Sequence, residues 1–136
     1  MLIDGEDGIT HINVYSKGKT EVGRFLSNFS YSPIIIDNLL FNSIEGYWYY
    51  IITDNILMCD KYGQHAKMFG KTLPRINEID PIKIKSAIDI KLKTYINRLN
   101  ELLTSDLPLA HYYVYNGKKK DAGSEYDWII EHIEYR

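Results

Sequence analysis

The sequence predicts an α+β fold, a single compact domain that is mainly helical and carries short strands and hairpins. Two apolar stretches are each interrupted by a residue pair that favours a tight turn, Asp37-Asn38 and Asn116-Gly117. Segments that begin near Ser43 and Asp80 instead repeat apolar residues at three-or-four spacing, the period of a helix. Strands and helices do not alternate regularly, which favours α+β over a parallel α/β sheet.

Length and composition indicate a single-domain protein without disulfides or membrane spans. A chain of 136 residues is expected to form one domain, and a net charge of −2 gives no strong electrostatic attraction to duplex nucleic acid or to an anionic membrane. One cysteine excludes an internal disulfide, and no apolar run approaches the roughly 18 residues of a membrane span. No secretion signal is recognisable, so we expect a cytoplasmic protein. Residues 1–10 are interpreted as a flexible leader to a domain of residues 11–136.

The first half of the chain predicts strands followed by helices. Residues 12–16 alternate like a half-buried strand, residues 16–24 are rich in turn formers, and residues 32–41 form a hairpin. A buried helix then begins, with Asn42 as its N-cap and Glu45 three residues further on. A second helix is expected over residues 56–69, ended by Gly70.

The second half predicts one long helix, a hairpin and a final helix. Asp80 as N-cap and Pro81 at the first helical position start the long helix, whose apolar residues continue to 102 or 103. Asn116-Gly117 is a strong hairpin turn signal within residues 110–123. The last helix is expected over residues 125–136.

Several familiar reaction classes find no support in the sequence. The Gly70-Lys71-Thr72 tripeptide is not a phosphate-binding P-loop, because the glycine that should open the motif is replaced by His65. The four histidines are scattered without metal-ligand spacing, and no nucleophile elbow occurs. Neither a metal nor a cofactor is expected.

Glu45 is the main candidate for chemistry, and two interpretations stay open. Its carboxylate could simply cap the helix by accepting a hydrogen bond from the amide of Asn42. Alternatively, Trp48, Tyr49 and Ile52 share its face of the helix, and apolar surroundings raise the pKa of a carboxyl group toward neutrality. Such a group could act as a general acid or base, and the rings could stack on a sugar or base.

Lys67 and Lys71 also have two interpretations. They are four residues apart beside the small residues Ala66 and Gly70, so they could meet a phosphate on one side of a helix end. Lysines near a helix C-terminus more often complement the helix dipole, and the residues alone favour that explanation.

A set of motifs in a fixed order resembles the NADAR/YbiA-like superfamily. The motifs are Ser27-Asn28-Phe29, a short hairpin, Ser43-Ile44-Glu45 opening an aromatic helix, and the stretch from Ala66 to Lys71. Later segments, "IKSAIDIKLKTYI" and "ELLTSDLP", are also similar to the family. The resemblance extends from about residue 11 to the C-terminus.

The resemblance implies a function and a set of roles. It implies an N-glycoside hydrolase that acts on a nucleotide-linked ribose, such as ADP-ribosylated guanine or a riboflavin-pathway intermediate, with Glu45 as the catalytic carboxylate. Its partner would be a small nucleotide-sugar ligand or ADP-ribosylated nucleic acid, and neither a membrane nor a metal would be involved. The substrate-binding residues would be Arg24, Ser27, Asn28, Phe29, Ser43, Tyr47, Trp48, Lys67, Gly70, Lys71, His111 and Asp121.

The chain also departs from the family pattern. Gly46 occupies a position where many members have histidine, and the tryptophan-glycine motif near the C-terminus is replaced by a segment that contains His111 and Asp121. These two residues could complete a site of altered specificity or be ordinary hairpin residues, and for His111 the latter is favoured. The departures favour an alternative function, a non-catalytic domain that sequesters ADP-ribose or NAD-type ligands.

Overall fold

The computed structural model describes residues 3–134, whose backbone forms two units. One unit comprises Asn28–Ile96, and the other comprises the segments before and after it, up to Ser27 and from Asn97. The middle unit contains β2 (Ile34–Ile36), β3 (Leu39–Phe41), α2 (Ile44–Thr53), a 3₁₀ helix (Ile56–Met58), α3 (Gly63–Lys71) and α4 (Pro81–Thr94). These elements confirm the predicted α+β class.

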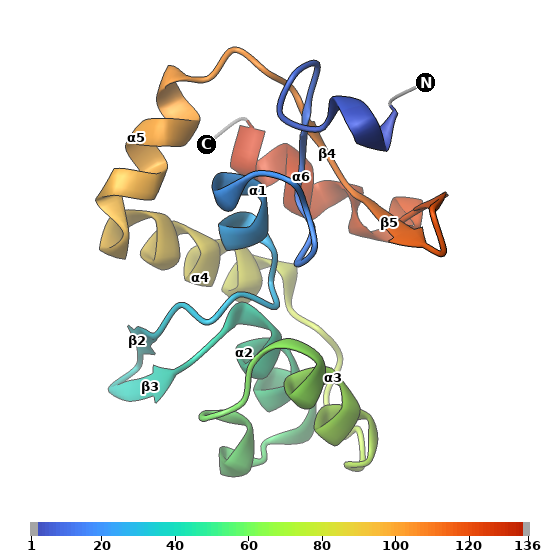
Figure 1. Ribbon diagram of the computed structural model, residues 1–136. Helices are drawn as coiled ribbons and strands as arrows, with labels where there is room; N and C mark the ends of the chain where they lie inside the picture. Colours follow the sequence, from blue (N-terminus) through green and yellow to red (C-terminus); the bar gives the residue numbers. More distant parts are fainter. Residues whose placement is uncertain (1–2, 135–136) are drawn as a thin grey trace. The chain divides into compact units, whose positions relative to one another are not determined.

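The first hairpin forms as its turn residues predict. β2 and β3 pair antiparallel, with Ile36 opposite Leu39 (Figure 1). Asp37 and Asn38 between them have φ angles of 50° and 68°, the left-handed conformation that a two-residue turn of this type requires.

Helix α2 begins one residue later than predicted. Its N-cap is Ser43, whose Oγ accepts a hydrogen bond from Gly46 N at 2.9 Å and donates one to Lys61 O at 2.9 Å. The amide of Asn42 instead donates to Asp60 O at 3.2 Å. The prediction of Asn42 as the cap was therefore wrong, because a backbone carbonyl outside the helix takes its amide.

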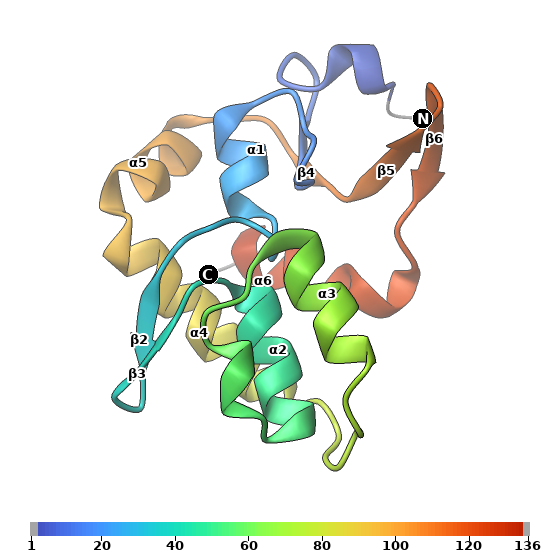
Figure 2. The ribbon, with the colours of Figure 1, turned by 60° about the horizontal axis from the view of Figure 1, so that its bottom comes forward.

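The predicted helix over residues 56–69 is replaced by two shorter elements, and Gly70 does not end it. The 3₁₀ helix is followed by α3, which begins at Gly63 and ends at Lys71. Gly70 lies inside α3 because α2 packs against α3 (Figures 1 and 2), and a Cβ atom on Gly70 would lie 2.3 Å from the ring of Tyr49. The glycine is needed for helix packing rather than for a cap.

The long helix predicted from residue 80 is interrupted at Tyr95. α4 starts as predicted, with Asp80 as N-cap and Pro81 at its first position. Tyr95 leaves the helical conformation (φ −108°, ψ 62°), its hydroxyl donates to Pro33 O at 2.9 Å, and α5 (Ile96–Thr104) follows. The apolar spacing is helical throughout this segment, but the contact of Tyr95 with Pro33 separates it into two helices.

The core of the middle unit contains a buried lysine. Lys91 is 2% exposed and donates from Nζ to Ser30 Oγ at 2.9 Å. Burial lowers the pKa of Lys91 from 10.5 to about 7, because the charged form loses its hydration. The apolar side chains in this core come from β2, β3, α2 and α4: Ile34, Phe41, Ile44, Ile51, Ile84, Ile88 and Leu92.

The other unit is held together by a short parallel pair of strands. β1 (Ile12–Asn13) pairs with β4 (Leu109–Ala110), so the expected strand over residues 12–16 is shorter than predicted. The side chain of Asn13 donates to Tyr112 O and accepts from Tyr112 N, each at 3.0 Å. His11 Nε2 and the hydroxyl of Tyr112 are 2.6 Å apart.

The remaining elements of this unit include one helix that the sequence did not predict. α1 (Glu21–Leu26) lies in the stretch expected to be turns, and Thr20 caps it by accepting from Gly23 N. β5 (Tyr112–Tyr115) and β6 (Lys118–Asp121) form the predicted hairpin around Asn116-Gly117, both with positive φ (Figure 2). A 3₁₀ helix (Ser124–Tyr126) precedes α6 (Asp127–Glu134), and the predicted end at 136 lies outside the described residues.

The segment before residue 11 contains a structural carboxylate. Asp7 is buried, and its two oxygens accept hydrogen bonds from Asn13 N at 2.9 Å and Lys19 N at 2.8 Å. A 3₁₀ helix (Asp4–Glu6) precedes it. The flexibility of residues 1–10 and the division at residue 11 stay predictions. In the described part of the chain, no helix is both long enough and apolar enough to cross a membrane.

Candidate functional site

Glu45 is fixed by its backbone in the first turn of α2. Its N–H donates to Asn28 O at 2.9 Å, while the cap formed by Ser43 sets the direction of the helix start. Ser43 is fully buried and hydrogen-bonded on both sides. The motifs around Asn28 and Ser43 therefore meet at one point, and their backbone contacts orient Glu45.

The electrostatic surroundings of Glu45 are unusual for a glutamate. Loss of hydration raises the pKa of its partly buried carboxyl group from 4.5 to about 7, and the nearby charges of Lys67 and Lys71 limit the rise. Within residues 3–134 the carboxylate accepts no hydrogen bond and forms no ion pair. The capping interpretation of Glu45 is therefore wrong, because the N–H of Asn42 donates to Cys59 O at 2.9 Å instead.

The two lysines approach Glu45 from α3. Ala66 and Gly70 form the buried side of α3, and Lys67 and Lys71 follow them by one residue each. Lys67 is half-buried, Lys71 is exposed, and neither forms an ion pair within the described residues. A carboxyl group that titrates near pH 7 can exchange a proton at neutral pH. The two unpaired ammonium groups beside it can attract an anion.

Two aromatic residues lie on the same side of α2 as Glu45. Trp48 and Tyr49 are both half-buried. The ring of Tyr49 packs on Gly70, as described above, so it positions α3 and its lysines against α2. Of the predicted site residues, the middle unit thus brings together Asn28, Ser43, Glu45, Lys67, Gly70 and Lys71, with Trp48 one turn after Glu45 on α2.

Asn28 and Phe29 connect the start of this unit to α2 and α3. While Asn28 O binds the N–H of Glu45, Phe29 O accepts from Gly63 N at 2.9 Å at the start of α3. The side-chain amide of Asn28 has no hydrogen-bond partner among residues 3–134. It is a polar group that a ligand beside Glu45 could use.

Gly46 has no room for a larger side chain. A Cβ atom there would lie 2.8 Å from Met58 O and 3.0 Å from Lys61 O. The end of the 3₁₀ helix and the residues after it therefore occupy the space that a histidine at this position would need. The departure at position 46 is coupled to the local backbone.

Four predicted site residues belong to the other unit. Arg24 lies in α1 and donates to Gly18 O at 2.8 Å, and Ser27 is the buried residue that follows α1. His111 contacts the rings of Tyr113 and Tyr126, and burial lowers its pKa, although Asp127 raises it. Asp121 is exposed in β6 and pairs with Lys119 at 3.4 Å. Their roles in a site stay predictions.

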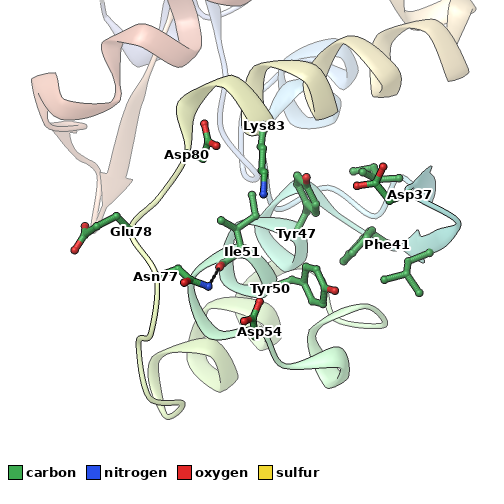
Figure 3. Close-up of a pocket in the computed structure, with 12 residues that line it drawn as sticks. Asp37, Phe41, Tyr47, Tyr50, Ile51, Asp54, Asn77, Glu78, Asp80 and Lys83 are labelled. Carbon is green, nitrogen blue, oxygen red and sulfur yellow. Dashed lines mark hydrogen bonds between the residues drawn. The ribbon is translucent and has the colours of Figure 1, made fainter.

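Tyr47 lies on the opposite side of α2 from Glu45. It lines a cleft of about 560 Å³ that Figure 3 shows, and Glu45 does not line this cleft. Sequence reasoning missed the cleft, although Tyr47, Tyr50, Ile51 and Asp54 recur at helical spacing along one side of α2. Its other lining residues are distant in sequence, from Ile36 to Lys83.

The described residues contain no group of three or more histidine, cysteine, aspartate or glutamate side chains that could hold a metal ion. Cys59 is the single cysteine, is partly exposed, and has its pKa raised by burial and by Asp60. A raised pKa makes it a weak nucleophile at neutral pH.

The fold has a counterpart of known structure. The NMR structure of the E. coli protein YbiA matches 98% of this chain and 83% of its own chain with a TM-score of 0.65, at 18% sequence identity. The sequence matches no family model and no curated protein. The fold is therefore YbiA-like, as the sequence motifs predicted.

Proposed function

We propose that this chain is an N-glycoside hydrolase that acts on a nucleotide-linked ribose, with Glu45 as its catalytic carboxylate. The observation that carries the proposal is the state of Glu45: a carboxyl group with a pKa of about 7 and no partner of its own within the described residues. Groups prepared in this way by desolvation are concentrated at functional sites. The YbiA-like fold and the order of the motifs support the same reaction class.

The chemistry requires a proton donor and a stabiliser of positive charge. The bond between the anomeric carbon and the base nitrogen breaks, water supplies the new oxygen on that carbon, and the base leaves with a proton. As a carboxylate, Glu45 stabilises the positive charge on the sugar and accepts a proton from water. As a carboxylic acid it donates a proton to the leaving base, and a pKa of about 7 makes both forms available at neutral pH.

Neighbouring groups suit the rest of such a substrate. Lys67 and Lys71 carry positive charge without an internal ion pair in the described part of the chain, which suits a phosphate or diphosphate. The amide of Asn28 can hydrogen-bond sugar hydroxyl groups, and Trp48 provides an aromatic surface for a ribose or base. Each role is part of the proposal.

The test is hydrolysis with matched variants. We expect the native chain to release ADP-ribose from ADP-ribosylated guanine in DNA, or the base from a riboflavin-pathway intermediate. Glu45→Gln should lower the rate about 100- to 10,000-fold without loss of binding. Asp60→Asn, which changes an exposed carboxylate of the same unit, is the control and should retain activity. Equal rates for the native chain and Glu45→Gln would refute the role of Glu45.

One observation favours a second function, a domain that sequesters ADP-ribose or NAD-type ligands without turnover. Position 46 cannot hold the histidine of the family pattern because of the backbone at Met58 and Lys61. If that histidine is needed for turnover, the ligand site would remain without the reaction. Tight binding of ADP-ribose by the native chain and by Glu45→Gln, with no hydrolysis by either, would support this function.

A further inference from the structure

The cleft on the far side of α2 from Glu45 has the dimensions of a ligand site. Its volume of about 560 Å³ falls within the range of small-molecule pockets. The turn of the β2–β3 hairpin, one side of α2, the segment before α4 and the first turn of α4 surround it (Figure 3). All its lining residues belong to the middle unit.

The charge of the cleft is strongly negative. Four carboxylates line it, and Lys83 is the one cation among its lining residues; the carboxylates are Asp37, Asp54, Glu78 and Asp80. Asp80 Oδ1 accepts from Ile82 N at 3.1 Å, and Glu78 pairs with Arg75 at 3.1 Å on the exposed surface. Asp37 and Asp54 have no side-chain hydrogen bond or ion pair within residues 3–134.

The hydroxyl group of a mostly buried tyrosine faces the same space. Tyr47 is 6% exposed, and its ring packs edge-on against Phe41 with a centroid distance of 5.0 Å. Its hydroxyl has no hydrogen-bond partner among the described residues and projects into the cleft at the level of Lys83 and Asp37 (Figure 3). No buried side-chain nitrogen or oxygen among the described residues lacks a hydrogen-bond partner, so this hydroxyl is in contact with solvent in the cleft, where a ligand donor could replace water as its partner.

The field at Tyr47 agrees with the charge of the lining. Burial raises the pKa of Tyr47, and the negative charges of Asp37 and Asp80 together with Tyr50 raise it further. A hydroxyl in such a field stays protonated, and its oxygen can still accept a hydrogen bond. A donor that carries positive charge would match both the hydroxyl and the carboxylates.

We propose that this cleft binds a small organic cation, an ammonium or guanidinium group on a short apolar stem. The cationic group lies beside Asp37 and the hydroxyl of Tyr47, the stem packs on the rings of Phe41 and Tyr50, and Asp54 supplies negative charge toward the other end of the cleft (Figure 3). Aromatic rings favour such groups through their negative faces, while the carboxylates supply charge and hydrogen-bond acceptors. This site is separate from Glu45 and does not depend on the proposed hydrolase activity.

The charge of Lys83 distinguishes a cationic ligand from an anionic one. Its ammonium group reaches into the cleft (Figure 3) and has no carboxylate partner within 4.0 Å in the described part of the chain. A cationic ligand must overcome its repulsion, so removal of this charge should tighten binding. An anionic ligand would depend on Lys83, and its removal would weaken binding instead.

The experiment is a titration of the full chain followed by ¹H–¹⁵N NMR. Putrescine and argininamide are the cationic probes, one an alkylammonium and the other a guanidinium, and 1,4-butanediol is the neutral analogue. We expect saturable shifts of cleft residues such as Asp54 and Asn77 with the cations and none with the diol. Asp54→Asn should weaken binding about fivefold, and Lys83→Ala should tighten it by a similar factor.

The variants are chosen to keep the fold. Asp54 has a φ of 55°, and asparagine tolerates this left-handed conformation as well as aspartate does. Asp60→Asn, an exposed carboxylate outside the cleft, is the matched control and should bind the cations like the native chain. Equal shifts with the diol, no shifts at all, an equal loss in Asp60→Asn, or weaker binding in Lys83→Ala would each overturn the proposal.

Discussion

The two sides of α2 differ in both packing and charge. On one side, Glu45 faces Lys67 and Lys71, and Tyr49 packs directly on the backbone of α3 at Gly70. On the other side, Tyr47 faces an open cleft lined by four carboxylates and one lysine. Helix α2 thus lies between a carboxyl group beside two lysines, at Glu45, and a lysine beside four carboxylates, at Lys83.

This difference shows how a helix of ten residues supports two environments. The helical period of 3.6 residues places Glu45, Trp48, Tyr49 and Ile52 on one side and Tyr47, Tyr50, Ile51 and Asp54 on the other. Aromatic rings appear on both sides, so they do not distinguish the two environments. Apart from Glu45 and Asp54, the charged residues come from other elements: α3 on one side, and the β2–β3 turn, the segment before α4 and the start of α4 on the other.

The largest change in stability is expected where α2 and α3 are in direct contact. In Gly70→Ala the new Cβ atom would lie 2.3 Å from the ring of Tyr49, so the two helices must separate. We expect the free energy of unfolding, measured by urea denaturation, to fall by about 3 kcal/mol. Gly5→Ala is the control because its Cβ would have nothing within 4 Å. Equal stability of the two variants would mean that Tyr49 does not pack on Gly70.

The second largest effect is the loss of folding stability caused by the desolvation of ionised Glu45. A pKa raised from 4.5 to about 7 means that the folded state holds the proton more tightly than the unfolded chain. Stability is therefore lost as the pH rises from about 4.5 to about 7, by up to about 3 kcal/mol. Glu45→Gln has no proton to lose, so it should be more stable than the native chain at pH 8.

The control for this prediction is the same comparison at pH 4. Glu45 is then mostly protonated in both states of the native chain, and the two proteins should have nearly equal free energies of unfolding. Lys91, with its pKa lowered to about 7, is present in both proteins and cancels in the difference. A native chain as stable as Glu45→Gln at pH 8 would show that the pKa of Glu45 is not raised.

Local sequence signals predicted the turns and one helix start correctly, because these depend on neighbouring residues. Asp37-Asn38 and Asn116-Gly117 adopt the left-handed conformations that their side chains tolerate, and Asp80 caps α4. The break at Tyr95 was missed because it depends on the hydrogen bond from the Tyr95 hydroxyl to Pro33 O, and Pro33 lies 62 positions earlier in the sequence. The glycine inside α3 was misread because its reason, Tyr49, lies on another helix.

For the candidate site too, the sequence predicted local features and missed those that depend on residues distant in the chain. The apolar face of α2 correctly indicated a raised pKa for Glu45, which burial causes. The cap at Ser43 and the contact of Glu45 N–H with Asn28 O required the folded chain. The acidic cleft was missed because its carboxylates come from four separate positions, and no single stretch carries the pattern.

A smaller effect tests whether the charge environments of the two sides are independent. Lys67→Met removes the largest charge that lowers the pKa of Glu45, so this pKa should rise above about 7. Lys83→Met, on the other side of α2, should leave it unchanged. The measurement is an NMR titration of the Glu45 side-chain carboxyl carbon. Equal shifts from both variants would contradict the separation of the two sides.

The smallest effect is expected at the hydroxyl of Tyr47. Tyr47→Phe keeps the buried ring and removes a group without a hydrogen-bond partner in the described structure, so the free energy of unfolding should change by less than about 0.5 kcal/mol. Tyr112→Phe is the matched control, because the hydroxyl of this tyrosine, which is also buried, lies 2.6 Å from His11 Nε2. Its loss should cost about 1–3 kcal/mol. A similar loss in both variants would mean that the Tyr47 hydroxyl already has a partner and is not vacant for a ligand.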